Sequence, residues 1–111
     1  MDVFRVVLRD DICEDVAIRW QSQLVDTLNC ILKTRGVSDR ELRRGILEEF
    51  FFSMASLLDG VAGGIEFEGM QYRPRLVFDD PSTPGTILVS DAFDLHDYTH
   101  SDIASMLAEE T

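Results

Sequence analysis

Two long helical patterns separated by a single glycine set the strongest limit on the possible folds of this chain. Apolar residues recur every three or four positions over residues 11–35 and again over residues 38–59. This spacing lines them up along one face of an α-helix. Because Gly36 is the only clear break between the two patterns, we expect two helices that fold back on each other as an antiparallel hairpin.

The ends of these two helices carry recognisable signals. Ser38 and Glu41 have the spacing of a capping box, in which each side chain accepts a hydrogen bond from the other residue's backbone amide. Asp59 followed by Gly60 is typical of a carboxyl-terminal stop. Asp11 is the expected start of the first helix. These signals predict that the second helix is capped by Ser38 and ends at Asp59.

After Gly60 the period changes from helical to alternating, which indicates strands. Pro74 has no backbone N–H, so the strand that contains it should lie at a sheet edge or be bulged. The expected elements are strands over residues 3–8 (or a backward extension of the first helix), 65–68, 72–78 and 86–90, a turn at Gly69-Met70, a loop over 79–85, and a helix over 99–110 capped by Thr99 or Ser101.

The order of these elements predicts an α+β fold. We expect an N-terminal helical hairpin packed on a small antiparallel sheet, with a short C-terminal helix. The length of 111 residues is that of a single domain, so we assign residues 1–111 to one α+β domain. A chain of this size can bury roughly 60–70% of its unfolded surface, so neither a metal nor a disulfide is needed for folding.

Charge is the most informative bulk property of the chain. It has 21 acidic and 10 basic residues, a net charge of −11, and residues 45–111 hold 13 of the acids with only Arg73 and Arg75 as bases. Such segregation disfavours nucleic acid and anionic membrane as partners and favours a basic protein or a cation. The alternative is an acidic surface that only keeps the protein in solution.

The leading functional hypothesis is a small acidic, non-enzymatic binding or inhibitory protein. An immunity protein or an antitoxin that covers the basic active site of a nuclease toxin binds through this kind of charge complementarity, because opposite charge accelerates association. The expected partner is therefore a basic protein, engaged through the acidic C-terminal half. The candidate partner-binding residues are Asp79, Asp80, Asp91, Asp94, Asp97 and Asp102.

The two histidines suggest an alternative function. His96 and His100 lie four residues apart, and on a helix this spacing would place both imidazoles on one face, where they could share a divalent metal. Asp94 or Asp91 could be a third ligand, and Asp97 has the position of the general base in an H-E-x-x-H site. The opposing interpretation is a surface turn whose aspartates cap the last helix. We expect no cofactor, with a metal-binding domain or metal-dependent hydrolase as the alternative.

The cysteines argue for a reducing compartment. Cys13 and Cys30 lie 17 residues apart on one expected helix, roughly 25 Å along its axis, whereas a disulfide needs Cα atoms within about 7 Å. We expect both to be buried, unreactive thiols. With no recognisable secretory signal and no stretch near the roughly 20 apolar residues of a membrane helix, the expected location is the cytoplasm.

Two further features bear on partners. Three consecutive aromatics, Phe50–Phe52, cover more of a helix than a one-sided core needs. They indicate either a helix buried on two sides or an exposed patch that forms a homodimer or partner interface, as in an oligomeric adaptor subunit. Arg73 and Arg75 are expected to pair with Glu66 and Glu68 across the hairpin of strands.

Overall fold

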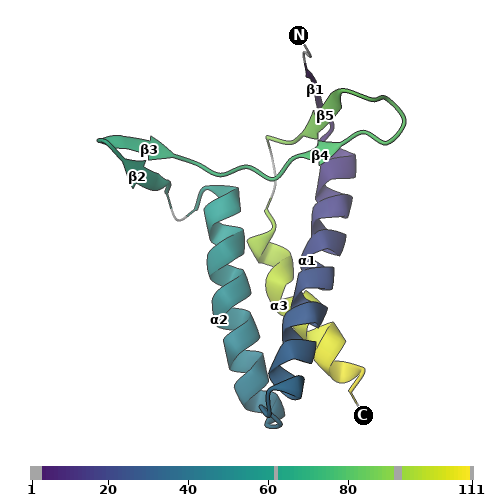
Figure 1. Cartoon of the computed structure of the whole chain (residues 1–111), viewed down its shortest axis with the longest axis vertical. Coiled ribbons are helices and arrows are strands. Elements are labelled where there is room, and N and C mark those ends of the chain that lie inside the picture. Colours follow the sequence, from purple (N-terminus) through teal and green to yellow (C-terminus); the bar gives the residue numbers. More distant parts are fainter. Residues whose placement is uncertain (1–3, 62, 92–93, 111) are drawn as a thin grey trace.

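The structure is a computed structural model that describes residues 4–61, 63–91 and 94–110. Its helices are α1 (Asp10–Thr34), α2 (Arg40–Asp59) and α3 (His96–Ala108), and its strands are β1 (Arg5–Leu8), β2 (Ile65–Phe67), β3 (Met70–Tyr72), β4 (Phe78–Asp79) and β5 (Thr86–Val89). The helices pack together, and the strands lie beyond one end of them (Figure 1). The fold is α+β, as the sequence predicted.

The helical hairpin forms as expected, with one change at its turn. Gly36 adopts a left-handed conformation, with φ 95°, between α1 and α2. The cap of α2 is Asp39, whose carboxylate accepts hydrogen bonds from the backbone amides of Glu41 and Leu42 at 2.9 and 3.3 Å. The predicted capping box at Ser38 is therefore wrong by one residue. Gly60 ends α2 in a left-handed conformation, with φ 80°, which confirms the predicted stop.

Helix α3 begins at His96, three residues before the predicted start at Thr99. Its first backbone amides are capped from outside the helix, because Asp59 Oδ1 accepts a hydrogen bond from the amide of Leu95 and Oδ2 accepts one from that of His96. Thr99 is buried, and its hydroxyl donates to Gln21 Oε1. The prediction that Thr99 or Ser101 caps the helix is wrong, because a side chain distant in sequence supplies that contact.

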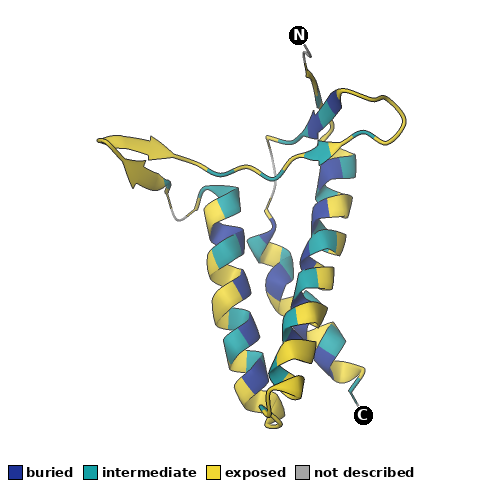
Figure 2. Ribbon diagram, viewed as in Figure 1, coloured by how far each residue is buried: buried dark blue, intermediate teal, exposed yellow. Residues whose placement is uncertain are grey.

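The core consists of two apolar clusters stacked along the helices. The cluster nearer the strands contains Cys13, Ala17, Ala55, Leu88 and Leu95. The other contains Val25, Leu47, Phe51, Ile103 and Leu107. Every helix contributes to at least one of them, and the buried residues follow the helix faces that turn inward (Figure 2). The helical periodicity of the sequence therefore marks real core faces.

The larger sheet has the order β1-β5-β4 and is mixed. β5 pairs in parallel with β1, in the register Arg5↔Thr86, and antiparallel with β4. The strand expected over residues 3–8 is confirmed over Arg5–Leu8, while Phe4 lies before the strand and residue 3 lies outside the described part. The parallel pair of β1 and β5 joins segments that are separated in the sequence by both long helices. No local sequence pattern predicts such a pairing.

The second sheet is a two-stranded hairpin of β2 and β3. Its two turn residues, Glu68 and Gly69, both have positive φ, 49° and 78°, as a type I′ turn requires. The predicted turn at Gly69-Met70 is thus shifted by one residue. The predicted strand over residues 72–78 is also wrong, because β3 ends at Tyr72 and the chain runs unpaired past Pro74 to β4.

The β2–β3 hairpin projects away from the helices (Figure 1). The radius of gyration of the chain is 16.3 Å, whereas a compact domain of this length has about 13 Å. The molecule is accordingly open and elongated. No helix in the described part of the chain is both long and apolar enough to cross a membrane.

Candidate functional site

Carboxylates gather around Tyr98, where the first turns of α3 and α1 meet. The Tyr98 hydroxyl donates a hydrogen bond of 2.6 Å to Glu14 Oε1. This bond and the charge of Glu14 raise the pKa of the tyrosine, with smaller contributions from burial and from Asp97 and Asp94. One helical turn before Glu14, Asp10 Oδ1 accepts hydrogen bonds from the Ser90 hydroxyl and the Asp91 amide. We call Asp10, Glu14, Asp91, Asp94 and Asp97 the acidic end.

The structure divides the six predicted partner-binding aspartates. Asp91, Asp94 and Asp97 belong to the acidic end. Asp102 does not, because its Oδ2 accepts a hydrogen bond of 3.0 Å from the buried amide of Gln21 and so holds α3 to α1. Asp79 and Asp80 lie in and just after β4, where Asp80 Oδ1 accepts a hydrogen bond from the Ser82 amide and shapes the loop.

Cationic groups offset little of the charge at the acidic end. Arg75 Nη1 lies 3.8 Å from Asp91 Oδ1, with both side chains exposed, and His96 Nε2 lies 3.4 Å from Asp97 Oδ1. An exposed pair such as that of Arg75 and Asp91 contributes about 0–1 kcal/mol. Within the described residues, the ion pairs of lysines and arginines from the two long helices go to Glu110 and not to these aspartates.

Sequence reasoning missed two members of the acidic end. Asp10 and Glu14 are in the N-terminal half of the chain, where acids and bases balance. Their spacing of four residues places them on one face of α1, which is a usable signal. That this face meets the start of α3 follows only from the packing of the helices.

The two histidines do share a face of α3, and Phe52 of α2 packs against both. The ring centroid of Phe52 lies 6.0 Å from that of His96 and 5.8 Å from that of His100. His96 Nδ1 is 2.5 Å from Asp59 Oδ2, and this hydrogen bond raises the pKa of His96 despite partial burial. His100 Nδ1 is 3.7 Å from Glu48 Oε1.

This histidine pair offers few free ligands to a metal. Asp59 occupies one ring nitrogen of His96, which leaves Nε2 as the other donor. Among the residues that the structure describes, no group of three histidine, cysteine, aspartate or glutamate side chains is placed to hold a metal ion. The observed contacts of His96 and His100 connect α2 to α3.

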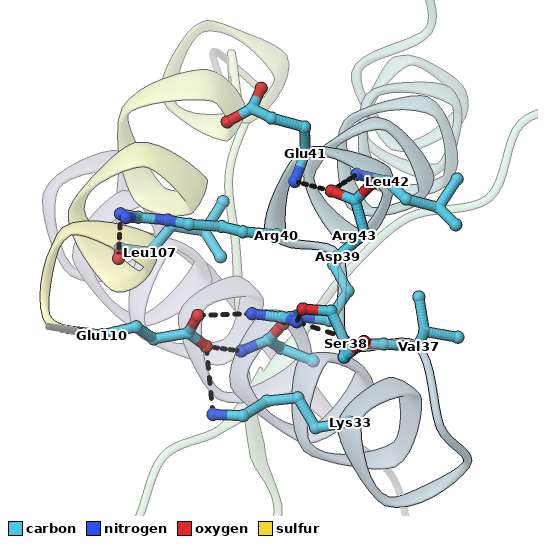
Figure 3. Close-up of polar contacts among 11 residues, drawn as sticks. Lys33, Val37, Ser38, Asp39, Arg40, Glu41, Leu42, Arg43, Leu107 and Glu110 are labelled. Atoms are coloured by element: carbon cyan, nitrogen blue, oxygen red, sulfur yellow. Dashed lines mark hydrogen bonds and ion pairs between the residues drawn. The ribbon is translucent and has the colours of Figure 1, made fainter.

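A second polar cluster lies at the opposite end of the helices, where Arg43 is 4% exposed (Figure 3). Its guanidinium donates to Asn29 Oδ1, to the carbonyls of Val37 and Ser38, and to Glu110 Oε2 at 2.6 Å. Glu110 Oε1 also accepts hydrogen bonds from Asn29 and Lys33.

These donors lower the pKa of Glu110 to about 2, with Asn29 as the largest cause. Arg40 adds a hydrogen bond to the carbonyl of Leu107, which ties the last turn of α3 to α2. All these polar groups are satisfied within the chain, so the cluster fixes the end of α3 in place. Sequence reasoning missed it, because Asn29 and Arg43 are embedded in apolar helical patterns.

An open apolar groove lies between α1 and α2. It has a volume of about 520 Å³ and contains no charged residue. The residues that line it are Leu24, Thr27, Leu28, Ile31, Ile46, Phe50, Phe51 and Met54. The three consecutive aromatics therefore lie in three different surroundings. Phe51 is 2% exposed in the core, Phe50 is 56% exposed at the groove, and Phe52 faces the histidines.

Two expectations for single side chains need correction. Arg73 donates to the carbonyl of Leu58, and Arg75 donates to that of Ser90, so neither pairs with the glutamates of the hairpin as predicted. Cys13 is buried, and desolvation and the charges of nearby aspartates raise its pKa. Cys30 is exposed, contrary to the prediction. Both thiols are free, as their separation in α1 requires.

Comparisons of this sequence with protein-family models, with curated proteins and with solved structures find no match.

Proposed function

We propose that this chain is a small non-enzymatic binding protein, of the immunity or antitoxin kind, that holds a basic protein partner through its acidic end. The observation that carries the proposal is the set of carboxylates around Tyr98, which have no close lysine or arginine from the long helices. A partner that brings arginine or lysine side chains to this surface supplies the missing positive charge.

The chemistry of the acidic end suits such a partner. Asp94 and Asp97 are exposed, and carboxylates accept two parallel hydrogen bonds from a guanidinium, which adds directional strength to the charge attraction. Tyr98 is partly buried, with both aspartates near it, and tyrosine is common among the residues that dominate binding energies. The net charge of −11 increases the rate at which a cationic protein arrives, by roughly 10- to 1,000-fold in steered associations.

A nuclease toxin is the partner class that we favour, and the cytoplasm is the location that we propose. Nuclease active sites are basic because they hold phosphates, so an acidic protein can occupy them in place of the substrate. Two free thiols fit a reducing compartment. The state of the reactive groups also favours binding over catalysis, because Cys13 is buried with a raised pKa and His96 is held by Asp59.

The test compares two triple variants of equal net charge. Asp91→Asn, Asp94→Asn and Asp97→Asn together remove charge from the acidic end. Asp26→Asn, Glu41→Gln and Glu109→Gln together remove the same charge from exposed positions elsewhere. Each variant and the natural chain are immobilised and used to capture proteins from the native host, and the captured basic protein is then purified.

The natural chain and the control variant should both bind the purified partner and inhibit its nuclease activity. The acidic-end variant should bind at least about tenfold more weakly, and binding of the natural chain should fall steeply between roughly 50 and 500 mM salt. Equal weakening by both variants would show that only net charge matters. A partner held equally at both salt concentrations would overturn the proposal.

A further inference from the structure

The β2–β3 hairpin carries an uncovered apolar face. The register pairs Ile65 with Tyr72 and Phe67 with Met70, so these four side chains share one face, while Glu66 and Gln71 share the other. The four are between 55% and 61% exposed. A two-stranded hairpin on its own is marginally stable in water, so this face is one that another surface should cover.

The groove between α1 and α2 has matching chemistry and length. Its lining is apolar and uncharged. From Leu24 to Ile31 it extends about 10 Å along α1, which is also the length of a three-residue strand at about 3.3 Å per residue. In the same chain the hairpin projects away from α1 and α2 (Figure 1), so a single copy does not fill the groove with its own hairpin.

We propose that the protein forms a symmetric dimer in which the hairpin of each copy packs its apolar face into the α1–α2 groove of the other. Each copy supplies one hairpin face and one groove. A two-fold axis therefore relates two identical hairpin–groove contacts. Glu66 and Gln71 remain in water in this arrangement.

The area of such a contact is that of a stable dimer. A large apolar side chain offers on the order of 150 Å² or more, so four that are more than half exposed present roughly 400 Å². The two hairpins together then bury on the order of 800 Å² of their own surface, and with the two groove surfaces the interface reaches the roughly 1,000 Å² expected of a specific interface. A single contact is smaller and holds two copies together more weakly.

The acidic end of each copy lies away from the groove. Glu14 at the acidic end and Leu28 in the groove are 14 residues apart on α1, which is about 21 Å. Salt at physiological concentration screens exposed charges beyond about 8 Å. The dimer uses no residue of the acidic end. The dimer proposal is therefore independent of the proposed function, and either one can fail while the other holds.

Light scattering coupled to size exclusion tests the dimer directly. The natural chain should have twice the 12.6 kDa of one copy. Phe67→Glu places a charge on the hairpin face, and Phe50→Glu places one in the groove. Each variant should be a monomer, because each breaks both contacts, while the control Gln71→Lys, which places a charge opposite Glu66 on the other hairpin face, should remain a dimer. Phe67 and Phe50 are exposed, so both variants should keep the circular dichroism of the natural chain.

A mixture of the two variants distinguishes the reciprocal hairpin–groove dimer from dimers of other geometry. The groove of the Phe67→Glu variant and the hairpin of the Phe50→Glu variant are both intact, so the mixture should form a weaker heterodimer held by one working contact, detected by native mass spectrometry at about 100 µM. A natural chain that is a monomer at about 100 µM overturns the proposal. So does a natural dimer whose two variants dimerise unchanged, or whose variants fail to combine in the mixture.

Discussion

The carboxylate of Asp59 joins the last residue of α2 to the first residue of α3 through His96. Its Oδ2 atom lies 2.8 Å from the backbone nitrogen of His96 and 2.5 Å from the ring Nδ1, and the aspartate side chain is fully buried. One side chain thus caps a helix and binds an imidazole. Because the protonated imidazole is favoured beside this carboxylate, the pKa of His96 is raised.

This raised pKa predicts that stability falls as the pH increases. A group whose pKa is higher in the folded chain stabilises it fully below the unfolded value, about 6.5 for histidine, and this contribution is lost as the pH rises through the folded value. The urea midpoint of the natural chain should therefore decrease from about pH 6 to pH 8.

His96→Gln should remove most of that slope, and His100→Gln, at an exposed position without the aspartate contact, should leave it unchanged. An NMR titration should show the His96 pKa returning toward its ordinary value in Asp59→Asn. An identical slope in natural protein and His96→Gln would contradict the assignment.

Glu110 predicts the opposite behaviour in acid. Its pKa is lowered to about 2 in the folded chain, so its contribution is present above its ordinary pKa and is lost as the pH falls from about 4.5 toward 2. Replacing it by glutamine should reduce the urea midpoint at pH 7 and make it depend less on pH in this range. Glu109→Gln, at an exposed neighbouring position, is the control and should follow the natural chain.

The adjacent aromatics Phe50 and Phe51 should differ sharply in their contribution to stability. Phe51→Ala should lower the free energy of unfolding by about 3–5 kcal/mol, because it opens a cavity in the core cluster that also contains Leu47 and Ile103. Phe50→Ala should cost about 1 kcal/mol or less at low protein concentration, since it loses mainly an edge contact with the Phe51 ring. Urea unfolding of the two variants measures the difference, and equal losses would contradict the assigned burial.

The turn of the hairpin should be improved by one substitution. Glu68 is held at φ 49°, a conformation that asparagine adopts more easily. Glu68→Asn should stabilise the hairpin by about 0.5–1 kcal/mol, seen as stronger cross-strand NMR contacts between Phe67 and Met70. Glu66→Asn removes a similar charge within β2 but has no left-handed position to relieve, so it should give no such gain.

The site could be predicted only in part. The excess of acids late in the chain points to Asp91, Asp94 and Asp97, and the structure places Asp94 and Asp97 near Tyr98 and Asp91 against Asp10. Asp102 was also selected on charge, but it is used to bind Gln21, a buried polar partner 81 positions away. Composition reports where carboxylates are in the sequence, whereas packing decides which of them a partner can reach.

The α+β class, the two long helices and the break at Gly36 follow from the sequence, because they depend on local periodicity and on the conformational preferences of single residues. The parallel pairing of β1 with β5, the capping of α3 by Asp59 and the burial of Arg43 against Glu110 become visible only in the folded chain. These contacts join residues tens of positions apart, and their energy depends on which helix faces meet, so the residues next to them in the sequence do not predict them.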